Sequence, residues 1–322
     1  MKVCVASPYP LDHLKGNSVT TRRIVSILRE RGVEARESDG WDGGEADVLI
    51  ALHAVKGADA VFEYQSANPK GRVAVLMTGT DLYEDFAKGS EVGERVLDQA
   101  DAIVVVQEAA IERLPQRVRK KAVVIPASLD EVSVKASPGG GGPFVISVVG
   151  HPRPVKRPFL TIEAVAKHPE WQEVEVWQIG EALDEESRVR AEQWEREDDR
   201  YRWFGAVARK RALDLCAKSS LTVNSSLLEG GANAVLEAMT MGVPVLASRI
   251  EGNVGLLGED YSGYFDEGRL EERISEVLEG RVDPADWVTE AKRRLPLFSR
   301  AREGTSWLDL LGKLNYQEAS YD

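Results

Sequence analysis

Cysteine and long hydrophobic runs are both scarce in this sequence. Only two cysteines, Cys4 and Cys216, occur among 322 residues, each inside an apolar stretch. Two such residues cannot supply a disulfide framework or a cysteine-rich metal site, so we expect two buried, reduced thiols. No run approaches the ~18 apolar residues of a membrane span, and the apolar stretch after Met1 is too short for a signal peptide. We therefore predict a cytoplasmic protein that does not bind a membrane.

Positive charge is in deficit as well. The chain has 41 Lys and Arg residues against 53 Asp and Glu residues, a formal net charge of −12. An acidic surface repels phosphate backbones, so we do not expect a nucleic-acid partner. The four histidines show no metal-ligand spacing and there is no Asp-x-Asp motif, so we predict no metal and no cofactor. An anionic ligand must then be held in a locally basic or amide-lined pocket.

Short apolar runs alternate with amphipathic helical patterns along the chain, which favours the α/β class with parallel sheets. At ~150 residues per domain, the length predicts two domains. The predicted strands are 3–7, 47–53, 73–78, 102–106 and 123–125, and then 144–149, 174–179, 201–204, 221–224 and 243–247. The predicted helices include 18–31, 91–100, 184–199, 233–241 and 284–314.

A linker composition interrupts this alternation, since residues 137–143 read Ser-Pro-Gly-Gly-Gly-Gly-Pro. We predict a first Rossmann-like domain at 1–130, a linker at 131–143 and a second Rossmann-like domain at 144–300. The two are expected to face each other across a cleft, where ligands of such folds bind. Residues 301–322 are expected to be helical, covering the second domain or packing back on the first.

The segment 227–247 is the most informative one. A strand ends in a Glu-Gly-Gly loop, a helix follows, and Gly242-Val243-Pro244 leads into the next strand. The free amides and positive dipole end of such a helix suit a diphosphate. Glu229 and Glu237 could each accept hydrogen bonds from a pair of sugar or ribose hydroxyls. The alternative is a glutamate that favours the helix dipole and a second one on an amphipathic helix. The predicted contacts of the loop are Gly230, Gly231, Ala232 and Asn233.

These residues resemble the GT-B glycosyltransferases that carry two glutamates separated by seven residues. The resemblance implies a GT-B fold, with Glu229 at the donor sugar, Glu237 at the nucleotide ribose, and uracil near Gly205. Members of that group hold the leaving diphosphate with an arginine and a lysine after the first strand of the second domain. Lys156 is in register with that lysine. His151 replaces the arginine, and Arg153 is the expected substitute; an ordinary basic loop is the alternative.

The first domain departs from that group, because Thr80 stands where its members place a histidine. A histidine at a strand end, His53, has a structural and a functional interpretation, and both stay open. The loop before the first helix offers a glycine turn, hydroxyls and cations for an anionic acceptor. The predicted acceptor residues are Lys15, Gly16, Asn17, Thr20, His53, Thr78, Gly79, Thr80 and Asp81.

Several runs look like the selenosugar synthases (SenB type) of selenoneine biosynthesis. They are Thr78–Tyr83, Arg153–Lys156, Tyr201–Trp203, Glu229–Asn233 and the residues from Ser248 to Phe265. The resemblance implies an enzyme that joins selenophosphate to the anomeric carbon of UDP-N-acetylglucosamine or UDP-glucose and releases UDP and phosphate. It implies small-molecule substrates and, as partners, the neighbouring enzymes of that pathway.

Two other functions stay open. One is a GT-B glycosyltransferase with a hydroxyl acceptor, which would need a general base, and the histidine absent at Thr80 counts against it. The other is a non-catalytic protein that binds nucleotide sugars. Lys156 and Arg153 count against that function, because stabilising a departing diphosphate matters for turnover.

Overall fold

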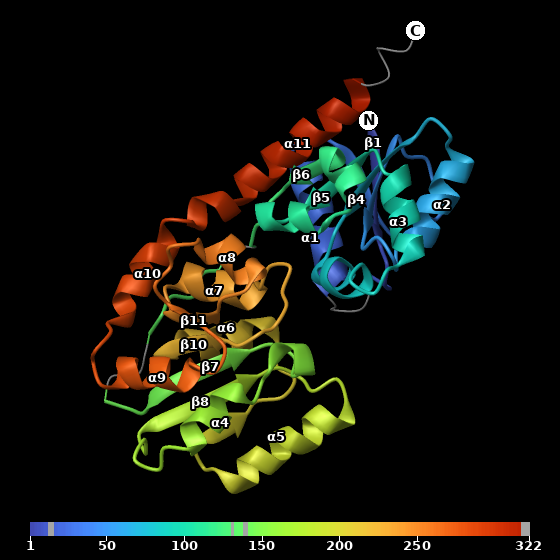
Figure 1. The fold of residues 1–322 in the computed structure, drawn as a ribbon. Coiled ribbons are helices and arrows are strands. Elements are labelled where there is room, and N and C mark those ends of the chain that lie inside the picture. Colours follow the sequence, from blue (N-terminus) through green and yellow to red (C-terminus); the bar gives the residue numbers. More distant parts are fainter. Residues whose placement is uncertain (12–15, 130–131, 138–140, 317–322) are drawn as a thin grey trace. The chain divides into compact units, whose positions relative to one another are not determined.

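The computed structural model describes residues 1–11, 16–129, 132–137 and 141–316. The chain forms two compact units (Figure 1). Unit 1 comprises Met1–Asp130 and Leu297–Asp322, and unit 2 comprises Glu131–Pro296. Within the described residues, no helix is both long enough and apolar enough to span a membrane.

Unit 1 is built on a six-stranded parallel sheet with the order β2-β1-β3-β4-β5-β6. Its strands are β1 (Lys2–Ser7), β2 (Glu34–Asp39), β3 (Val48–Leu52), β4 (Arg72–Leu76), β5 (Ala102–Val105) and β6 (Ala122–Val124). Its α-helices are α1 (Gly16–Glu30), α2 (Ala58–Ala67), α3 (Glu91–Gln99) and α11 (Arg300–Tyr316), and a short π-helix, η1, covers Asp81–Asp85.

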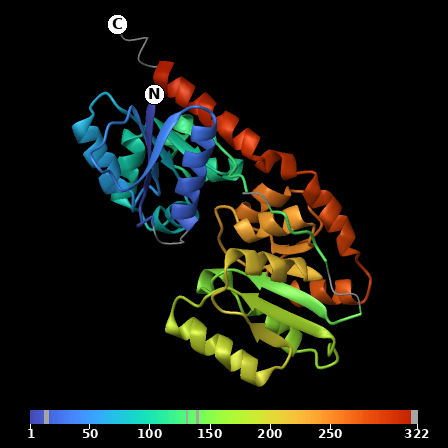
Figure 2. The same cartoon turned by 180° about the vertical axis from the view of Figure 1, so that it is seen from behind.

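Successive side chains of these strands alternate between two apolar layers, as the period of two in a strand requires. One layer joins Cys4, Leu49 and Val73 to helices α2 and α3. The other joins residues such as Val5 and Ile50 to α1 and α11. Helices therefore cover both faces of the sheet, and α1 and α11 lie side by side (Figure 2).

The stretch 284–314, predicted as one helix, is two helices, and that prediction was wrong. Helix α10 (Pro284–Lys292) ends before a 3₁₀ turn at Leu295–Phe298, and α11 begins at Arg300. Pro296 lies in that turn, and proline lacks the N–H group that a continuous helix needs. Helix α11 belongs to unit 1, where Trp307 and Leu311 are almost fully buried.

A buried glutamate anchors α11. The Oε2 atom of Glu303 accepts hydrogen bonds from the backbone N–H of Ser128, at 2.7 Å, and from its hydroxyl. The same oxygen lies 3.3 Å from Nε of Arg23 on α1. This carboxylate joins α11, α1 and the segment after β6 within unit 1.

Unit 2 contains a second six-stranded parallel sheet, with the order β12-β11-β10-β7-β8-β9. Its strands are β7 (Phe144–Val149), β8 (Val174–Ile179), β9 (Tyr201–Trp203), β10 (Leu221–Asn224), β11 (Val245–Ser248) and β12 (Tyr264–Phe265). Its other helices are α4 (Leu160–Ala166), α5 (Glu185–Glu197), α6 (Arg209–Ala217), α7 (Asn233–Met241), α8 (Glu251–Leu257) and α9 (Leu270–Leu278).

Both sheets reverse their strand order beside the first strand of the unit. In unit 1 the chain passes from β1 to β2 on one side and then to β3 on the other. In unit 2 it passes from β7 through β8 and β9, and then returns to β10 on the other side of β7. Crevices at the carboxyl ends of such strand pairs are the usual ligand sites of parallel α/β sheets.

The α/β class with parallel strands is confirmed, and two strands were not predicted. Strand β2 is polar along its length and lies at the edge of its sheet, so it lacks the apolar run of a buried strand. Strand β12 has two residues, too few for any pattern. Cys4 and Cys216 are buried free thiols.

Candidate functional site

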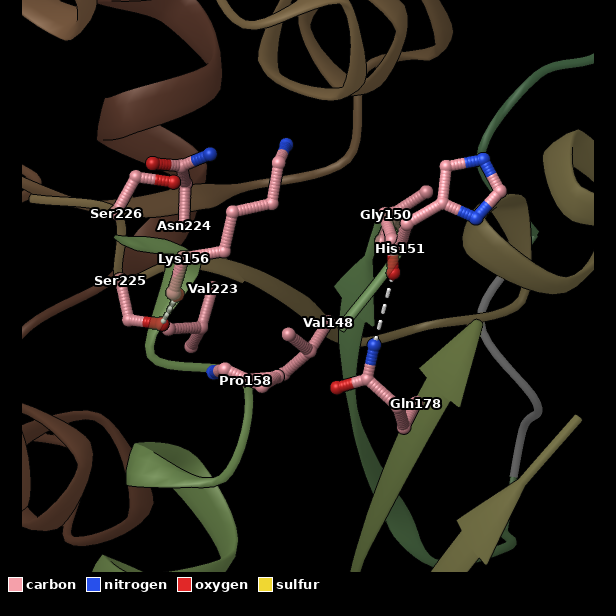
Figure 3. Close-up of a pocket in the computed structure, with 11 residues that line it drawn as sticks. Val148, Gly150, His151, Lys156, Pro158, Gln178, Val223, Asn224, Ser225 and Ser226 are labelled. Carbon is pink, nitrogen blue, oxygen red and sulfur yellow. Dashed lines mark hydrogen bonds between the residues drawn. The ribbon is translucent and has the colours of Figure 1, made fainter. Parts of the chain in front are cut away.

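A pocket opens at the carboxyl ends of β7, β8 and β10 in unit 2 (Figure 3). It is lined by Val148, Val149, Gly150, His151, Lys156, Pro158, Gln178, Val223, Asn224, Ser225 and Ser226. Figure 3 shows Lys156, Ser225 and Ser226 on one side and Gly150 and Gln178 on the other. The pocket lies at the point where the sheet reverses its strand order.

Two glycines let the backbones after β7 and β8 approach each other. Gly150 and Gly180 have φ values of 139° and 149°, which L side chains rarely adopt. A Cβ atom on Gly180 would lie 2.2 Å from the carbonyl oxygen of Gly150. The Gln178 amide donates to the same carbonyl at 3.1 Å. The loop that carries the basic residues is therefore fixed at its first residue.

The loop after β7 is also joined to the loop after β10. The Ser225 hydroxyl donates to the carbonyl oxygens of Lys156 and Arg157, both at 2.9 Å. Nε of Arg157 donates to the Ser225 carbonyl at 2.8 Å, and the Leu227 N–H donates to Val155 O at 2.8 Å. Arg157 has a φ of 44°, a strained value for a residue with a side chain. These bonds hold Lys156 beside Glu229.

Glu229 receives both of its side-chain hydrogen bonds on one oxygen. Lys156 Nζ lies 3.0 Å from Oε1, and the Ser226 hydroxyl donates to Oε1 at 2.9 Å. Within the described parts of the chain, no residue donates to Oε2. Helix α8 lies against this loop, because a Cβ on Gly252 would lie 2.2 Å from Glu229 O. The carboxylate is thus fixed by one oxygen and open at the other.

Glu237, about one turn along α7, repeats this arrangement. Nε and one terminal nitrogen of Arg209, at the start of α6, lie 3.1 and 2.9 Å from its Oε1. No donor to Oε2 occurs among the residues that the structure covers. Burial raises the pKa of the Glu237 carboxyl, and the charge and hydrogen bonds of Arg209 act in the opposite direction. Arg209 was not predicted, because a lone arginine before a helix carries no motif.

The other predicted donor residues lie in the loop before α7, at the start of α7, and in the loops after β7 and β9. Ala232 caps α7 without a side-chain hydrogen bond, which leaves the first amides of the helix for another acceptor. Gly231 and Asn233 on this turn are exposed, and Gly205 follows β9 with a φ of 59°. Arg153 is exposed, and within the described ranges no acidic side chain pairs with it.

In unit 1, Asp81 is fully buried and bonded to the backbone around it. It accepts hydrogen bonds from the N–H groups of Ala54 at 2.8 Å, Thr78 at 2.6 Å and Leu82 at 3.1 Å. The Thr78 hydroxyl adds a fourth at 2.9 Å. Asp81 therefore joins the segments after β3 and β4, and it fixes the turn that contains Gly79 and Thr80.

His53 is 1% exposed and has a φ of 70°. Its Nδ1 accepts a hydrogen bond from the Lys56 N–H at 3.2 Å. Nδ1 also lies 3.8 Å from Asp81, and Nε2 lies 3.7 Å from Asp85. Burial lowers the pKa of the imidazole. His53 thus supports the turn after β3, and its own ring is not exposed to a ligand.

The turn supported by His53 presents a cation that was not predicted. Lys56 is exposed, and its Nζ lies 2.8 Å from the hydroxyl of Tyr9, which follows β1. The two side chains meet where the sheet of unit 1 reverses its strand order. Asn17 and Thr20 are partly exposed near the start of α1, and Gly16 is exposed. Lys15 lies outside the described residues.

The site in unit 2 can bind a hydroxylated, negatively charged ligand. Two carboxylate oxygens are open to hydroxyl donors, while Lys156, Arg153 and the first amides of α7 suit phosphate oxygens. In the part of the chain that the structure describes, no three His, Cys, Asp or Glu side chains are grouped to hold a metal ion.

Solved structures with this fold cover nearly the whole chain. HepE of Anabaena, in complex with UDP and glucose, is similar over 97% of this chain and 100% of its own, with a TM-score of 0.77 and 17% identity. Sucrose-phosphate synthase from Thermosynechococcus elongatus is similar over 98% of this chain and 99% of its own, with a TM-score of 0.79 and 14% identity. The predicted GT-B fold is confirmed.

Sequence comparison agrees with the fold. Glycosyltransferase 1 domain-containing protein 1 of Xenopus tropicalis is 26% identical over an alignment of 277 residues, and the match covers 77% of this chain and 79% of that protein. The family model described as glycosyl transferases group 1 matches residues 131–294, just over half of the chain. The chain with these two partly open glutamates therefore belongs to the group 1 glycosyltransferases.

Proposed function

We propose that this glycosyltransferase is a selenosugar synthase that takes a UDP-sugar as donor and selenophosphate as acceptor. Selenium attacks the anomeric carbon, the bond from that carbon to the UDP oxygen breaks, and UDP leaves. Water then cleaves the phosphorus–selenium bond, which yields phosphate and the 1-selenosugar. The donor is UDP-N-acetylglucosamine or UDP-glucose.

The observation that carries the donor half is the pair of carboxylates, each bonded through Oε1 and open at Oε2. Glu237 would accept the ribose hydroxyls, and Glu229 would accept hydroxyls of the transferred sugar. HepE, which shares the fold, has been solved with UDP and glucose and with UDP-glucose. These facts support a UDP-sugar donor.

Lys156 and Arg153 would stabilise the leaving group. As the bond to the anomeric carbon breaks, negative charge develops on the diphosphate of UDP, and fixed cations lower the energy of that state. The ammonium of Lys156 has three N–H donors. It can keep its hydrogen bond to Glu229 while it donates to a phosphate oxygen, so the sugar and diphosphate contacts would form together.

The chemistry of unit 1 supports an acceptor that needs no base. A hydroxyl acceptor needs a group that removes its proton. The Asp81 carboxylate accepts four hydrogen bonds and is 0% exposed, and His53 is 1% exposed. Selenophosphate is anionic at selenium before it attacks, so catalysis reduces to positioning and leaving-group stabilisation. The resemblance to selenosugar synthases supports the same acceptor.

The acceptor assay tests this proposal. The purified chain is incubated with UDP-N-acetylglucosamine or UDP-glucose and with selenophosphate, and the products are followed by mass spectrometry. We expect UDP, phosphate and a 1-selenosugar. Parallel reactions contain inorganic phosphate, glucose or glycerol in place of selenophosphate. Transfer to the hydroxyl compounds with none to selenophosphate would replace the proposal by the hydroxyl-acceptor alternative.

A further inference from the structure

A cation outside the family motif controls the geometry of Glu237. Arg209 stands at the first position of α6, and Glu237 lies in the middle of α7, a helix that packs against α6. The Arg209 side chain is half exposed, whereas that of Glu237 is 15% exposed. The arginine therefore reaches from the surface over a mostly buried carboxylate.

The contacts between them are directional. Two nitrogens of the guanidinium lie 3.1 and 2.9 Å from Oε1 of Glu237. The Arg209 Nε donates a hydrogen bond to Oε1, and the terminal nitrogen lies beside the same oxygen as its ion-pair partner. Oε2 keeps both of its lone-pair positions, and in the described chain no residue donates to it. A ribose presents two adjacent hydroxyl donors, which match two positions on one oxygen.

We propose that Arg209 is a positioning residue that prepares Glu237 to recognise the ribose of the donor nucleotide. This inference rests on the proposed function, because it takes Glu237 as the ribose contact. Arg209 orients the carboxylate so that Oε2 faces the ligand, and its positive charge opposes the rise in pKa that burial causes. It touches Glu237 and not the reacting atoms, so its effect is on nucleotide selectivity.

Arg209 is also the charged group that acts on the titration of Glu237. Burial raises the pKa of this carboxyl, and the charge and hydrogen bonds of Arg209 lower it. The titratable group beside it is the buried Cys216 thiol of α6, whose own pKa is raised by burial to about 11. The thiol is neutral at physiological pH, so Arg209 is the charged neighbour that opposes the effect of burial on the pKa of Glu237.

The test compares binding of UDP and 2′-deoxy-UDP by calorimetry. We expect the unmodified chain to prefer UDP by about 10- to 100-fold, the usual worth of a hydrogen bond to a charged group. Arg209→Gln should reduce this preference to about two- or threefold, mainly by weakening the binding of UDP. Arg209→Lys should restore part of it. Arg211→Gln, an exposed arginine on the same helix, is the matched control and should leave the preference unchanged.

The pH dependence of the preference for UDP distinguishes a positioning role of Arg209 from a general contribution to folding or binding. The substitution Arg209→Gln should raise the pKa of Glu237 further. As the pH is lowered, the variant should therefore lose its preference for UDP at a higher pH than the unmodified chain does. Arg209→Gln should change nothing in a Glu237→Gln background, because the two residues act together.

Each failure has its own outcome. An Arg209→Gln variant that binds both nucleotides equally less well, with the preference intact, would overturn the inference, since Arg209 would then contact the diphosphate or support the fold. A Glu237→Gln variant that binds UDP and keeps the preference would instead remove Glu237 from the donor site in the proposed function.

Discussion

Both six-stranded parallel sheets reverse their strand order beside their first strand, but the polar groups at their strand ends are bonded differently. In unit 2, Glu229 and Glu237 pair with Lys156 and Arg209, and each keeps one carboxylate oxygen open. In unit 1, Asp81 is bonded on all sides by Ala54, Thr78 and Leu82. Unit 2 thus leaves one oxygen of each glutamate without a hydrogen bond from the described residues, whereas unit 1 uses its buried aspartate to shape a turn.

This difference explains why one site carries a recognisable motif. A side chain that reaches a ligand with its own carboxylate depends on its length and on its distance from the helix start, so the residue type and spacing are constrained together. A turn that binds through backbone groups constrains only the residues that hold its shape. The comparison predicts catalytic losses from changes at Lys156 in unit 2 and structural losses from changes at Asp81 and His53 in unit 1.

The largest effect is expected at Lys156. Lys156→Ala removes the cation that we propose stabilises the leaving diphosphate, and it should cost about 2–4 kcal/mol of transition-state stabilisation, or about 30- to 1,000-fold in kcat. Steady-state kinetics with UDP-sugar and selenophosphate measure the loss. Lys167→Ala, which removes an exposed lysine paired with Glu271, is the control and should leave kcat unchanged. An unchanged rate for Lys156→Ala would remove its assignment.

A change at Asp81 should lower the free energy of unfolding more than it lowers the catalytic rate. Asp81→Asn keeps the volume but replaces a hydrogen-bond acceptor by an NH₂ group that faces N–H donors, at a cost of about 2–4 kcal/mol. Denaturant unfolding, with hydrogen exchange of residues 48–58 as the local readout, measures it. The matched variant is Asp85→Asn, because Oδ2 of Asp85 has no hydrogen bond within the described residues. Equal losses of unfolding free energy in the two variants would show that the hydrogen bonds of Asp81 do not stabilise the fold more than the contacts of Asp85 do.

A smaller, pH-dependent effect is expected at His53. Burial lowers the pKa of this imidazole, against the opposing charges of Asp81 and Asp85. The unfolded chain then takes up a proton near pH 6.5 before the folded chain does, so stability falls as the pH drops from about 7. His53→Asn tolerates the positive φ and should flatten this fall.

Thermal unfolding midpoints at pH 7.5 and 5.5 measure the slope for the His53 variant. His151→Asn, at an exposed histidine of unit 2, should keep the slope of the unmodified chain. A slope that stays the same in His53→Asn would mean that other groups cause it.

The smallest effect is expected at the start of α1. Asn17→Ala and Thr20→Val each remove one neutral hydrogen-bonding group and should raise the KM for selenophosphate about 3- to 10-fold. The KM for the UDP-sugar should not change. Ser26→Ala, further along the same helix, is the control. If the UDP-sugar KM rises and that of selenophosphate does not, this loop belongs to the donor.

Sequence patterns predicted the strands that are buried on both faces, because such strands are continuous apolar runs. Strand β2 was not predicted, because the sequence of an edge strand with charged residues along it resembles that of a loop. At the candidate site, Glu229, Glu237 and Lys156 were found because a motif fixes their spacing. Arg209 and Lys56 were not, because each is a single cation whose partner is distant in sequence, 28 residues away for Arg209 and 47 for Lys56.

The division of unit 1 into Met1–Asp130 and Leu297–Asp322 has a consequence for how the chain is made. Ribosomal synthesis delivers the first segment before unit 2, but Trp307, Leu310, Leu311 and Leu314, which complete one of its apolar layers, are made after unit 2. Unit 2 is contiguous and can finish folding while its predecessor still exposes the surface that α11 will cover. The apolar layer of unit 1 therefore cannot be complete until all of unit 2 has been synthesised.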